Sequence, residues 1–362
     1  MRKILPLKAI TGHYVLAIII YLFASILFAS AWADGQGIWD RDTLTGDWGG
    51  VRSDLSDRGV DIGLRLTQYG QRVITGGRNV NGEYGGTMDY RFNIDTHKLF
   101  GTWQGFSINM HARTRFGDDV LADVGGLTLP NTGLLQPAPG DYHNTDVTGL
   151  TANQYFPLGK THLGMATIGK IDVIDAVTLF FPTVGYGQES FWNTNALVTA
   201  LPWFGAVTGL SLYGGWLAAI NKEKQIGQSA VLALSTRDAS TSWPSISSSF
   251  DDGVWIAAFH RFLYDIGNKP GYFMVFGGAS TRDQPSNDSR DFMIVPGEGI
   301  ESTDEKKPWN IALYLNQVLW KADQNSNRRV EMLAGGTVGP DNPQFAQYNL
   351  FTNVESFGLF DS

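Results

Sequence analysis

The feature that most constrains this chain is a strict alternation of apolar and polar side chains along two neighbouring stretches. In residues 87–97, TMDYRFNIDTH, apolar side chains occupy the even positions and charged or amide side chains the odd ones. Residues 105–117, GFSINMHARTRFG, repeat the pattern, and residues 60–67, VDIGLRLT, follow it on a shorter scale. Because side chains point alternately to the two faces of a strand, all three stretches are predicted to be strands with one apolar and one polar face.

The length of the alternation separates two kinds of β protein. A soluble β-sandwich also alternates apolar and polar positions, with its apolar face inside. Here the two longer stretches run for ten residues or more, which suits strands of about 9–11 residues tilted across a bilayer. Only a closed barrel leaves no unpaired strand edge in lipid, and its lumen is polar. We therefore predict an all-β, transmembrane antiparallel β-barrel, with a soluble secreted β protein as the alternative.

Further strands are expected down the chain, separated by loops rich in Gly, Pro, Asn, Asp and Ser. The stretch WNIALYLNQVLW has Trp309 and Trp320 at its two ends, as an aromatic girdle at the membrane interfaces would. With the three stretches above, the expected strands number about twelve. The nine further ranges are 148–156, 162–170, 207–219, 229–236, 253–264, 270–281, 308–320, 328–339 and 344–352.

The first 33 residues have the three parts of a secretory signal. Arg2, Lys3 and Lys8 form a basic start, an apolar run follows, and Ala31-Trp32-Ala33 is a small-residue cleavage site. The apolar run is shorter than the ~20 residues of a spanning helix. We expect a signal peptide over 1–33, an N-terminal segment over 34–59 and the barrel over 60–362.

A short helix is expected in the segment before the first strand. In LTGDWGGVRSDLSDRG, Val51 and Leu55 lie four residues apart, as on one face of a helix. Ser53 is expected to cap this helix and Gly59 to end it. The adjacent Gly49 and Gly50 permit a tight turn beside the preceding tryptophan.

Composition and motifs argue against several functions. The net charge of −8 speaks against nucleic acid as a partner, and a chain with 0 Cys has neither disulfides nor thiolate metal sites. No G-x-S-x-G, H-E-x-x-H or P-loop motif is present. The six His show no i,i+4 spacing, and the pairs Asp118–Asp119 and Asp251–Asp252 fall in predicted loops, where solvated turns are expected. We predict no enzyme, cofactor or metal site.

Two ordered blocks resemble one known family. LTGDWGGVRSDLSDRGVDI resembles the N-terminal signature of the OprB-type carbohydrate-selective porins of Gram-negative outer membranes, and VTGLTANQYF, GKIDVID and GYGQESFWNTNALVTALPW resemble its middle. The resemblance implies a sixteen-stranded barrel in outer-membrane lipid, folded by the barrel-assembly machinery, through which mono- or small oligosaccharides diffuse passively. It also implies that 34–59 is a periplasmic segment with a short helix. Since about twelve strands are visible and the chain stops at FGLFDS, in an expected loop, we expect about the last four strands to be missing.

The polar faces of the first three strands carry the candidate sugar contacts. Arg side chains supply fixed donors and Asp and Asn supply acceptors, which together match sugar hydroxyls. The resemblance implies a constriction lined with arginine. The alternative is that the arginines pair with Asp89 and Asp95 and only fill the lumen wall. The candidate residues are Arg65, Arg91, Asn93, Asp95, Asn109, His111, Arg113 and Arg115.

Three aromatic residues are candidates for stacking on sugar rings. Phe191, Trp192 and Trp203 belong to a long stretch without alternation that contains two prolines, and such a stretch can fold into a pore. Girdle or loop packing is the alternative role. For the whole protein, a general or anion-preferring porin, a soluble sugar-binding β protein and a barrel enzyme are the competing functions, and the oligomeric state is left open.

Overall fold

The structure is a computed structural model of the chain. It describes residues 43–118, 120–125, 145–158, 162–172, 175, 206–217, 225–237, 250–286, 288–295, 299–323, 328–344 and 347–358. The expected signal peptide lies outside the described residues.

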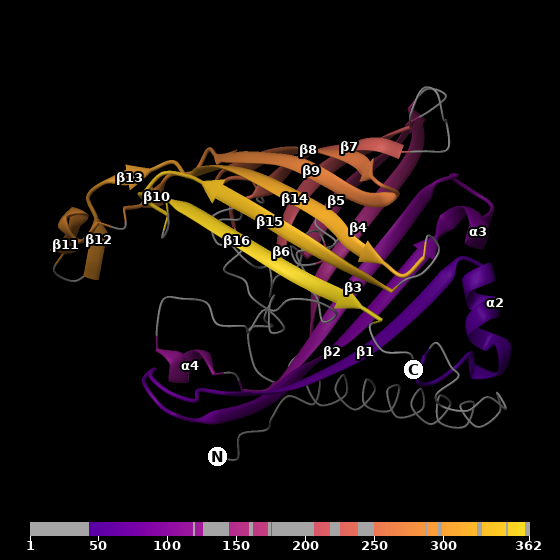
Figure 1. The fold of residues 1–362 in the computed structure, drawn as a ribbon, viewed down its shortest axis with the longest axis horizontal. Helices are drawn as coiled ribbons and strands as arrows, with labels where there is room; N and C mark the ends of the chain where they lie inside the picture. The colour runs from indigo at the N-terminus through magenta and orange to yellow at the C-terminus, as the bar shows by residue number, and fades with distance from the viewer. Residues whose placement is uncertain are drawn as a thin grey trace, which may run out of the picture.

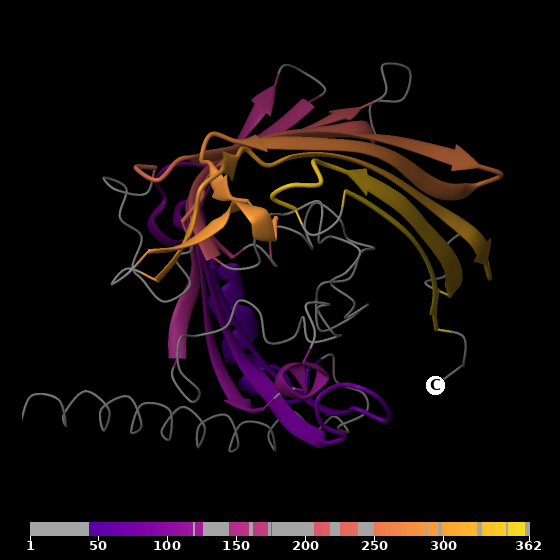
Figure 2. The same cartoon turned by 90° about the vertical axis from the view of Figure 1, so that its left-hand side faces the viewer.

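Twelve strands form one continuous sheet in which each strand pairs antiparallel with the next. The sheet curls into a shell with a C-shaped cross-section, and β1 and β16 are its two edges (Figures 1 and 2). The predicted all-β class and the twelve principal strands are confirmed. The strands are β1 Val60–Arg72, β2 Gly82–Asp95, β3 Phe106–Gly117, β4 Thr145–Leu158, β5 His162–Asp172, β6 Ala206–Leu217, β7 Gln225–Ser235, β8 Val254–Ile266, β9 Lys269–Ser280, β14 Trp309–Lys321, β15 Arg329–Val338 and β16 Tyr348–Phe357.

Several predicted strand bounds need correction, among them those of the last strand and of the strand expected over 87–97. The last strand was expected over 344–352, but β16 begins at Tyr348. The strand expected over 87–97 ends at Asp95, because Thr96–Phe100 form the short helix α3. His97 therefore belongs to a helix and not to the polar face of β2. The Asp95 carboxylate caps α3 by accepting from the backbone N–H groups of His97 and Lys98.

The two ends of the shell differ in the segments that connect the strands. Helices α2 (Val51–Asp57) and α3 lie at the end where β1 begins and β2 ends (Figure 1). At the opposite end are α4 (Leu121–Val124) and the connection from β9 to β14. That connection forms two small hairpins, made of β10 Gln284–Pro285 with β13 Glu305–Lys306 and of β11 Phe292–Val295 with β12 Gly299–Ser302, and the short helix η5 Ser289–Asp291.

The segment before β1 folds as a turn followed by a helix. The turn η2 (Trp48–Gly50) buries Trp48, and its two glycines have φ values of 69° and 95°, which favour glycine. Helix α2 follows, as expected, but Ser53 is not its cap. Instead the N–H and hydroxyl of Ser53 both donate to the Asp47 carboxylate.

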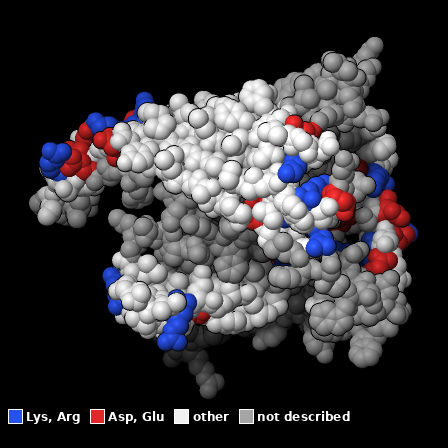
Figure 3. All heavy atoms as spheres, viewed as in Figure 1, with Lys and Arg blue, Asp and Glu red and all other residues white. Residues whose placement is uncertain are grey.

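The outer face of the sheet is apolar. Leu313 on β14 is 48 % exposed, and Val275, which lies opposite it on β9, is 37 % exposed. Figure 3 shows uncharged side chains over β8, β9 and β14, with charges gathered toward the ends of these strands. Among the described residues, no helix combines the length and apolarity required to cross a membrane.

The inner face is not uniformly polar, which corrects the expectation of a polar lumen. Over β2 and β3 it carries charged and amide side chains. Over β8, β9 and β14 it carries a buried apolar cluster that includes Trp255, Phe259, Phe276 and Tyr314. These strands are apolar on both faces, so their sequence alone does not identify which face is inside.

Candidate functional site

A cavity of about 340 Å³ lies against the inner wall formed by β2 to β5. Its lining mixes amide, hydroxyl and charged groups with a few apolar side chains. This volume is at the lower end of the range typical of small-molecule sites. The lining residues are Arg91, Asn93, Asn109, Met110, His111, Gly149, Thr151, Asn153, Tyr155, Met165, Thr167, Lys170, Ile171, Asp172, Asp175 and Leu232.

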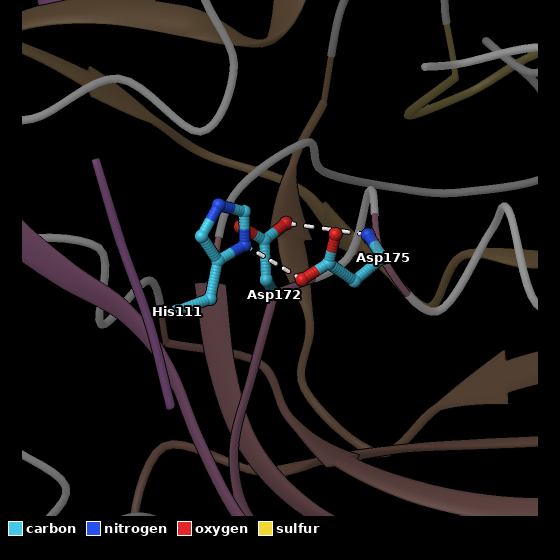
Figure 4. A group of neighbouring side chains, drawn as sticks. All are labelled: His111, Asp172 and Asp175. Carbon is cyan, nitrogen blue, oxygen red and sulfur yellow. Dashed lines mark hydrogen bonds and ion pairs between the residues drawn. The ribbon is translucent and has the colours of Figure 1, made fainter. Parts of the chain in front are cut away.

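His111 on β3 is the centre of a charged cluster at this cavity. Its Nε2 lies 2.8 Å from Asp89 Oδ1, and its Nδ1 lies 2.7 Å from Asp175 Oδ2 and 3.4 Å from Asp172 Oδ2. Figure 4 shows the imidazole facing the carboxylates of Asp172 and Asp175. The ring is only 4 % exposed, so three carboxylates surround a buried imidazole.

Two arginines complete the cluster and occupy different environments. Arg113 donates through Nε to Asp89 Oδ1 at 2.6 Å, and both residues are buried. The Thr87 hydroxyl donates to the second oxygen of Asp89. Arg91 donates to Asp175 Oδ1 at 2.9 Å, and its side chain is 49 % exposed. Arg91 is therefore accessible from the cavity, whereas Arg113 supports Asp89 from within the wall.

The strand register explains this arrangement. Asp89 on β2 lies opposite Arg113 on β3, and the two form an ion pair. Arg91 lies opposite His111, and both side chains contact the Asp175 carboxylate. A register shift between His111 and Ala112 in the pairing of β3 with β4 marks the same level. The shift in strand register and the charged side chains therefore lie at the same level of the sheet.

Asp172 and Lys170 reach the inner side because β5 departs from strict alternation. Ile168 is 51 % exposed, yet Lys170, two residues later, is 2 % exposed and lines the cavity. Gly169 lies between them with φ +139°, a conformation that side chains other than glycine rarely adopt. This backbone change places Lys170 and Asp172 beside the charged cluster.

Next to the charged cluster, uncharged polar side chains form a band across β2, β3, β4 and β5. Asn93 pairs in register with Asn109, which pairs with Thr151 on β4, and Asn153 pairs with Thr167 on β5. The Thr167 hydroxyl donates to the side-chain amide oxygen Oδ1 of Asn153 at 2.7 Å. The band presents both donors and acceptors to the cavity.

Of the predicted site residues, the structure brings four to the cavity wall: Arg91, Asn93, Asn109 and His111. Arg113 is buried behind them. Arg65 lies on β1 opposite Asp89, and Arg115 lies on β3 opposite Thr87; neither is among the residues that line the cavity. The alternative interpretation was that the arginines pair with Asp89 and Asp95. Arg113 does pair with Asp89, but Asp95 caps α3. Phe191, Trp192 and Trp203 lie outside the described residues.

Several lining residues were missed by the sequence analysis. Thr151, Asn153 and Tyr155 follow the same alternation on the strand expected over 148–156, and this signal was available. Asp172 and Asp175 had no such signal, because the latter follows the end of β5 and is 64 residues from His111. Within the described residues, these two carboxylates and His111 are the set whose donor atoms lie close enough together to hold a metal ion.

No protein-family model matches the chain, and no curated protein matches it. Among solved structures, the high-pH structure of Pseudomonas putida OprB matches with a TM-score of 0.64 and 16 % identity, over 89 % of this chain and 76 % of that one. The low-pH structure of the same protein has a TM-score of 0.46 and 14 % identity, over 83 % and 73 % of the two chains. Salmonella typhi OmpF in complex with daunomycin has a TM-score of 0.32 and 10 % identity, over 85 % and 92 %. The first of these similarities establishes that the chain shares the fold of OprB, as its resemblance to the OprB-type porins predicted.

Proposed function

We propose that this protein is an outer-membrane porin through which neutral mono- or small oligosaccharides diffuse passively, and that the cavity on β2 to β5 contacts them. The observation that carries the proposal is charge compensation at the cavity. Arg91, His111 and Arg113 face Asp89, Asp172 and Asp175 within hydrogen-bonding or ion-pair networks. The wall therefore offers many hydrogen-bonding groups without a field of a single sign.

The groups at the cavity match the chemistry of sugars. A sugar hydroxyl both donates and accepts, as do the amides of Asn93, Asn109 and Asn153 and the threonine hydroxyls beside them. Arg91 adds fixed donors at a half-exposed position. Tyr155, which is 46 % exposed, adds an aromatic surface for the apolar face of a sugar ring. These groups replace part of the hydration shell of a passing sugar.

The apolar outer face supports a location in the outer membrane. Lipid-facing positions of a membrane barrel are apolar, and the outward side chains of β14 fit that requirement. In this location the partners are outer-membrane lipids, the barrel-assembly machinery and the diffusing sugars. Passive diffusion requires neither catalysis nor a cofactor.

An anion-preferring pore is the second candidate. Arg91 and Lys170 line the cavity and Arg113 is buried in the same wall, and an excess of cations there would attract anions. Swelling of liposomes that contain the detergent-purified protein distinguishes the two functions. A neutral hexose should enter faster than an organic anion or an amino acid of similar size. Faster entry of the anion would contradict sugar preference, and absence of swelling would contradict the channel itself.

The first prediction concerns Arg91. Replacement by Ala should slow hexose entry by about tenfold below saturation, because one charge-assisted hydrogen bond contributes about 1.5 kcal/mol. Lys321→Ala is the matched control, since Lys321 lies at the end of β14 and away from the cavity. Initial rates of liposome swelling give the comparison. Equal rates of hexose entry for the two variants would show that Arg91 does not contact the sugar.

A further inference from the structure

The geometry points to a binding site for a zinc-class divalent cation, formed by His111, Asp172 and Asp175 on the lumen wall. Three donor atoms meet there: Nδ1 of His111 and one oxygen of each carboxylate, all within 4.8 Å of one another. Nδ1 lies 2.7 Å from the Asp175 oxygen and 3.4 Å from the Asp172 oxygen. Ligand atoms about 2.0–2.1 Å from a tetrahedral zinc ion are separated by about 3.3 Å. Small shifts would therefore bring the three atoms to coordination distance.

The surrounding hydrogen bonds already orient these donors as metal ligands are oriented. A ligating histidine usually donates its second ring N–H to a carboxylate. The Nε2 of His111 lies 2.8 Å from Asp89 Oδ1, so Nδ1 faces the other two carboxylates. Asp89 is in turn held by Arg113 and Thr87. The imidazole would release its Nδ1 hydrogen when the ion binds.

Asp175 is oriented in the same way. Its Oδ1 accepts from Arg91 at 2.9 Å, which leaves Oδ2 facing His111. The backbone N–H of Asp175 lies 3.4 Å from Asp172 Oδ1, while Asp172 Oδ2 faces His111. Each carboxylate thus directs one oxygen to the imidazole and the other to a neighbouring group. An ion between the three donors would displace few of these contacts.

The type and charge of the donors select the kind of ion. One imidazole with two carboxylates suits zinc and similar transition ions, whereas Ca²⁺ requires six to eight oxygen ligands. The site opens onto the cavity, which provides an entry path and room for a water molecule or solute as a further ligand. Lys170 lines the same cavity, and its positive charge repels a bound cation. We therefore expect the site to bind an exchangeable ion, so that added Zn²⁺ occupies it and EDTA removes the ion.

Isothermal titration of Zn²⁺ into the full detergent-purified protein, without a histidine tag and after dialysis against EDTA, tests the site. The wild type should bind one ion saturably. His111→Gln should abolish binding, and His97→Gln should retain it, because His97 is exposed on α3. Asp175→Asn, at a partly exposed position, is a second ligand variant for which loss is expected. Asp89→Asn should weaken affinity by about 10- to 100-fold, as loss of an outer-shell partner does.

Three outcomes would overturn the site: no saturable zinc binding by the wild type, binding by His111→Gln equal to that of His97→Gln, or Ca²⁺ binding as tight as that of Zn²⁺. The electrophoretic shift on heating verifies that each variant is folded. Visible absorption of the protein with Co²⁺ gives an independent reading, since a four-coordinate site yields an intense band that an octahedral aqueous ion lacks. None of these measurements involves sugar, and hexose entry in EDTA tests the proposed channel separately.

Discussion

At the residue scale, the pair of Arg113 and Asp89 is the part of the wall most sensitive to change. Both side chains are at most 4 % exposed, and Nε of Arg113 lies 2.6 Å from the carboxylate. Removing Arg113 takes the guanidinium from Asp89 but leaves the His111 imidazole and the Thr87 hydroxyl in place, and losing one such partner of a buried group costs about 1–3 kcal/mol. Arg113→Ala should therefore lower the free energy of unfolding by about this amount. Urea unfolding in detergent, followed by tryptophan fluorescence, measures it.

Lys321→Ala is the reference for this measurement, because Lys321 is only half-buried at the end of β14, where loss of a charged side chain should alter stability by no more than about 1 kcal/mol. The double variant Arg113→Ala with Asp89→Ala should recover part of the loss, since it removes both charges. Equal stability of Arg113→Ala and Lys321→Ala would show that the pair is not buried in the folded protein.

Alternation predicted the residues on β2 and β3 that reach the cavity, because register and face follow directly from a period of two. It did not predict which of them are accessible. Arg91 and Arg113 lie on the same face, yet only Arg91 is open to the cavity. Asp172 and Asp175 were missed for a different reason. Asp172 follows the backbone change at Gly169 and Asp175 lies beyond the end of β5, and neither position has a signature in residue spacing.

At the element scale, the twelve strands were predictable because each has alternating or continuous apolar residues between clusters of turn-forming residues. The start of α3 was missed although its signals are local. Asp95 is a favourable N-cap, and Gly101 ends the helix with φ 69°. The alternation before Asp95 extends in sequence to His97, so the strand pattern obscured the cap.

Gly169 is the residue on which the shape of β5 depends. Its φ of +139° is strained for other residues, and an added Cβ would collide with the carbonyl oxygen of Leu150. Gly169→Ala should lower the free energy of unfolding by about 1–3 kcal/mol. Gly277→Ala on β9 is the control, because its Cβ would meet only Asn310 O, at an ordinary 3.5 Å. Urea midpoints measure both, and equal midpoints would contradict the role of Gly169.

At the scale of the whole molecule, the described part of the sheet has an apolar outer face over β8, β9 and β14 but two kinds of inner face. Strands with apolar residues on both faces are compatible with a sheet that curves in either direction. An example is β8, with Trp255 inside and Ile256 outside. The charged strands β2 and β3 resolve this ambiguity, because their polar residues line the cavity. The curvature, and hence the assignment of inside and outside for β8, β9 and β14, required the structure.

The outer face yields a test that separates a membrane barrel from a soluble shell. Leu315 lies at the middle of β14 and Leu319 near its end, and their exposures are similar, 39 % and 43 %. In a membrane barrel, an outward-facing arginine costs about 2–4 kcal/mol at the bilayer midplane but only about 0–1 kcal/mol near an interface. Leu315→Arg should therefore reduce the free energy of folding into liposomes far more than Leu319→Arg. A soluble protein has no such dependence on depth, so equal effects of the two substitutions in reversible urea titrations would exclude lipid from this face.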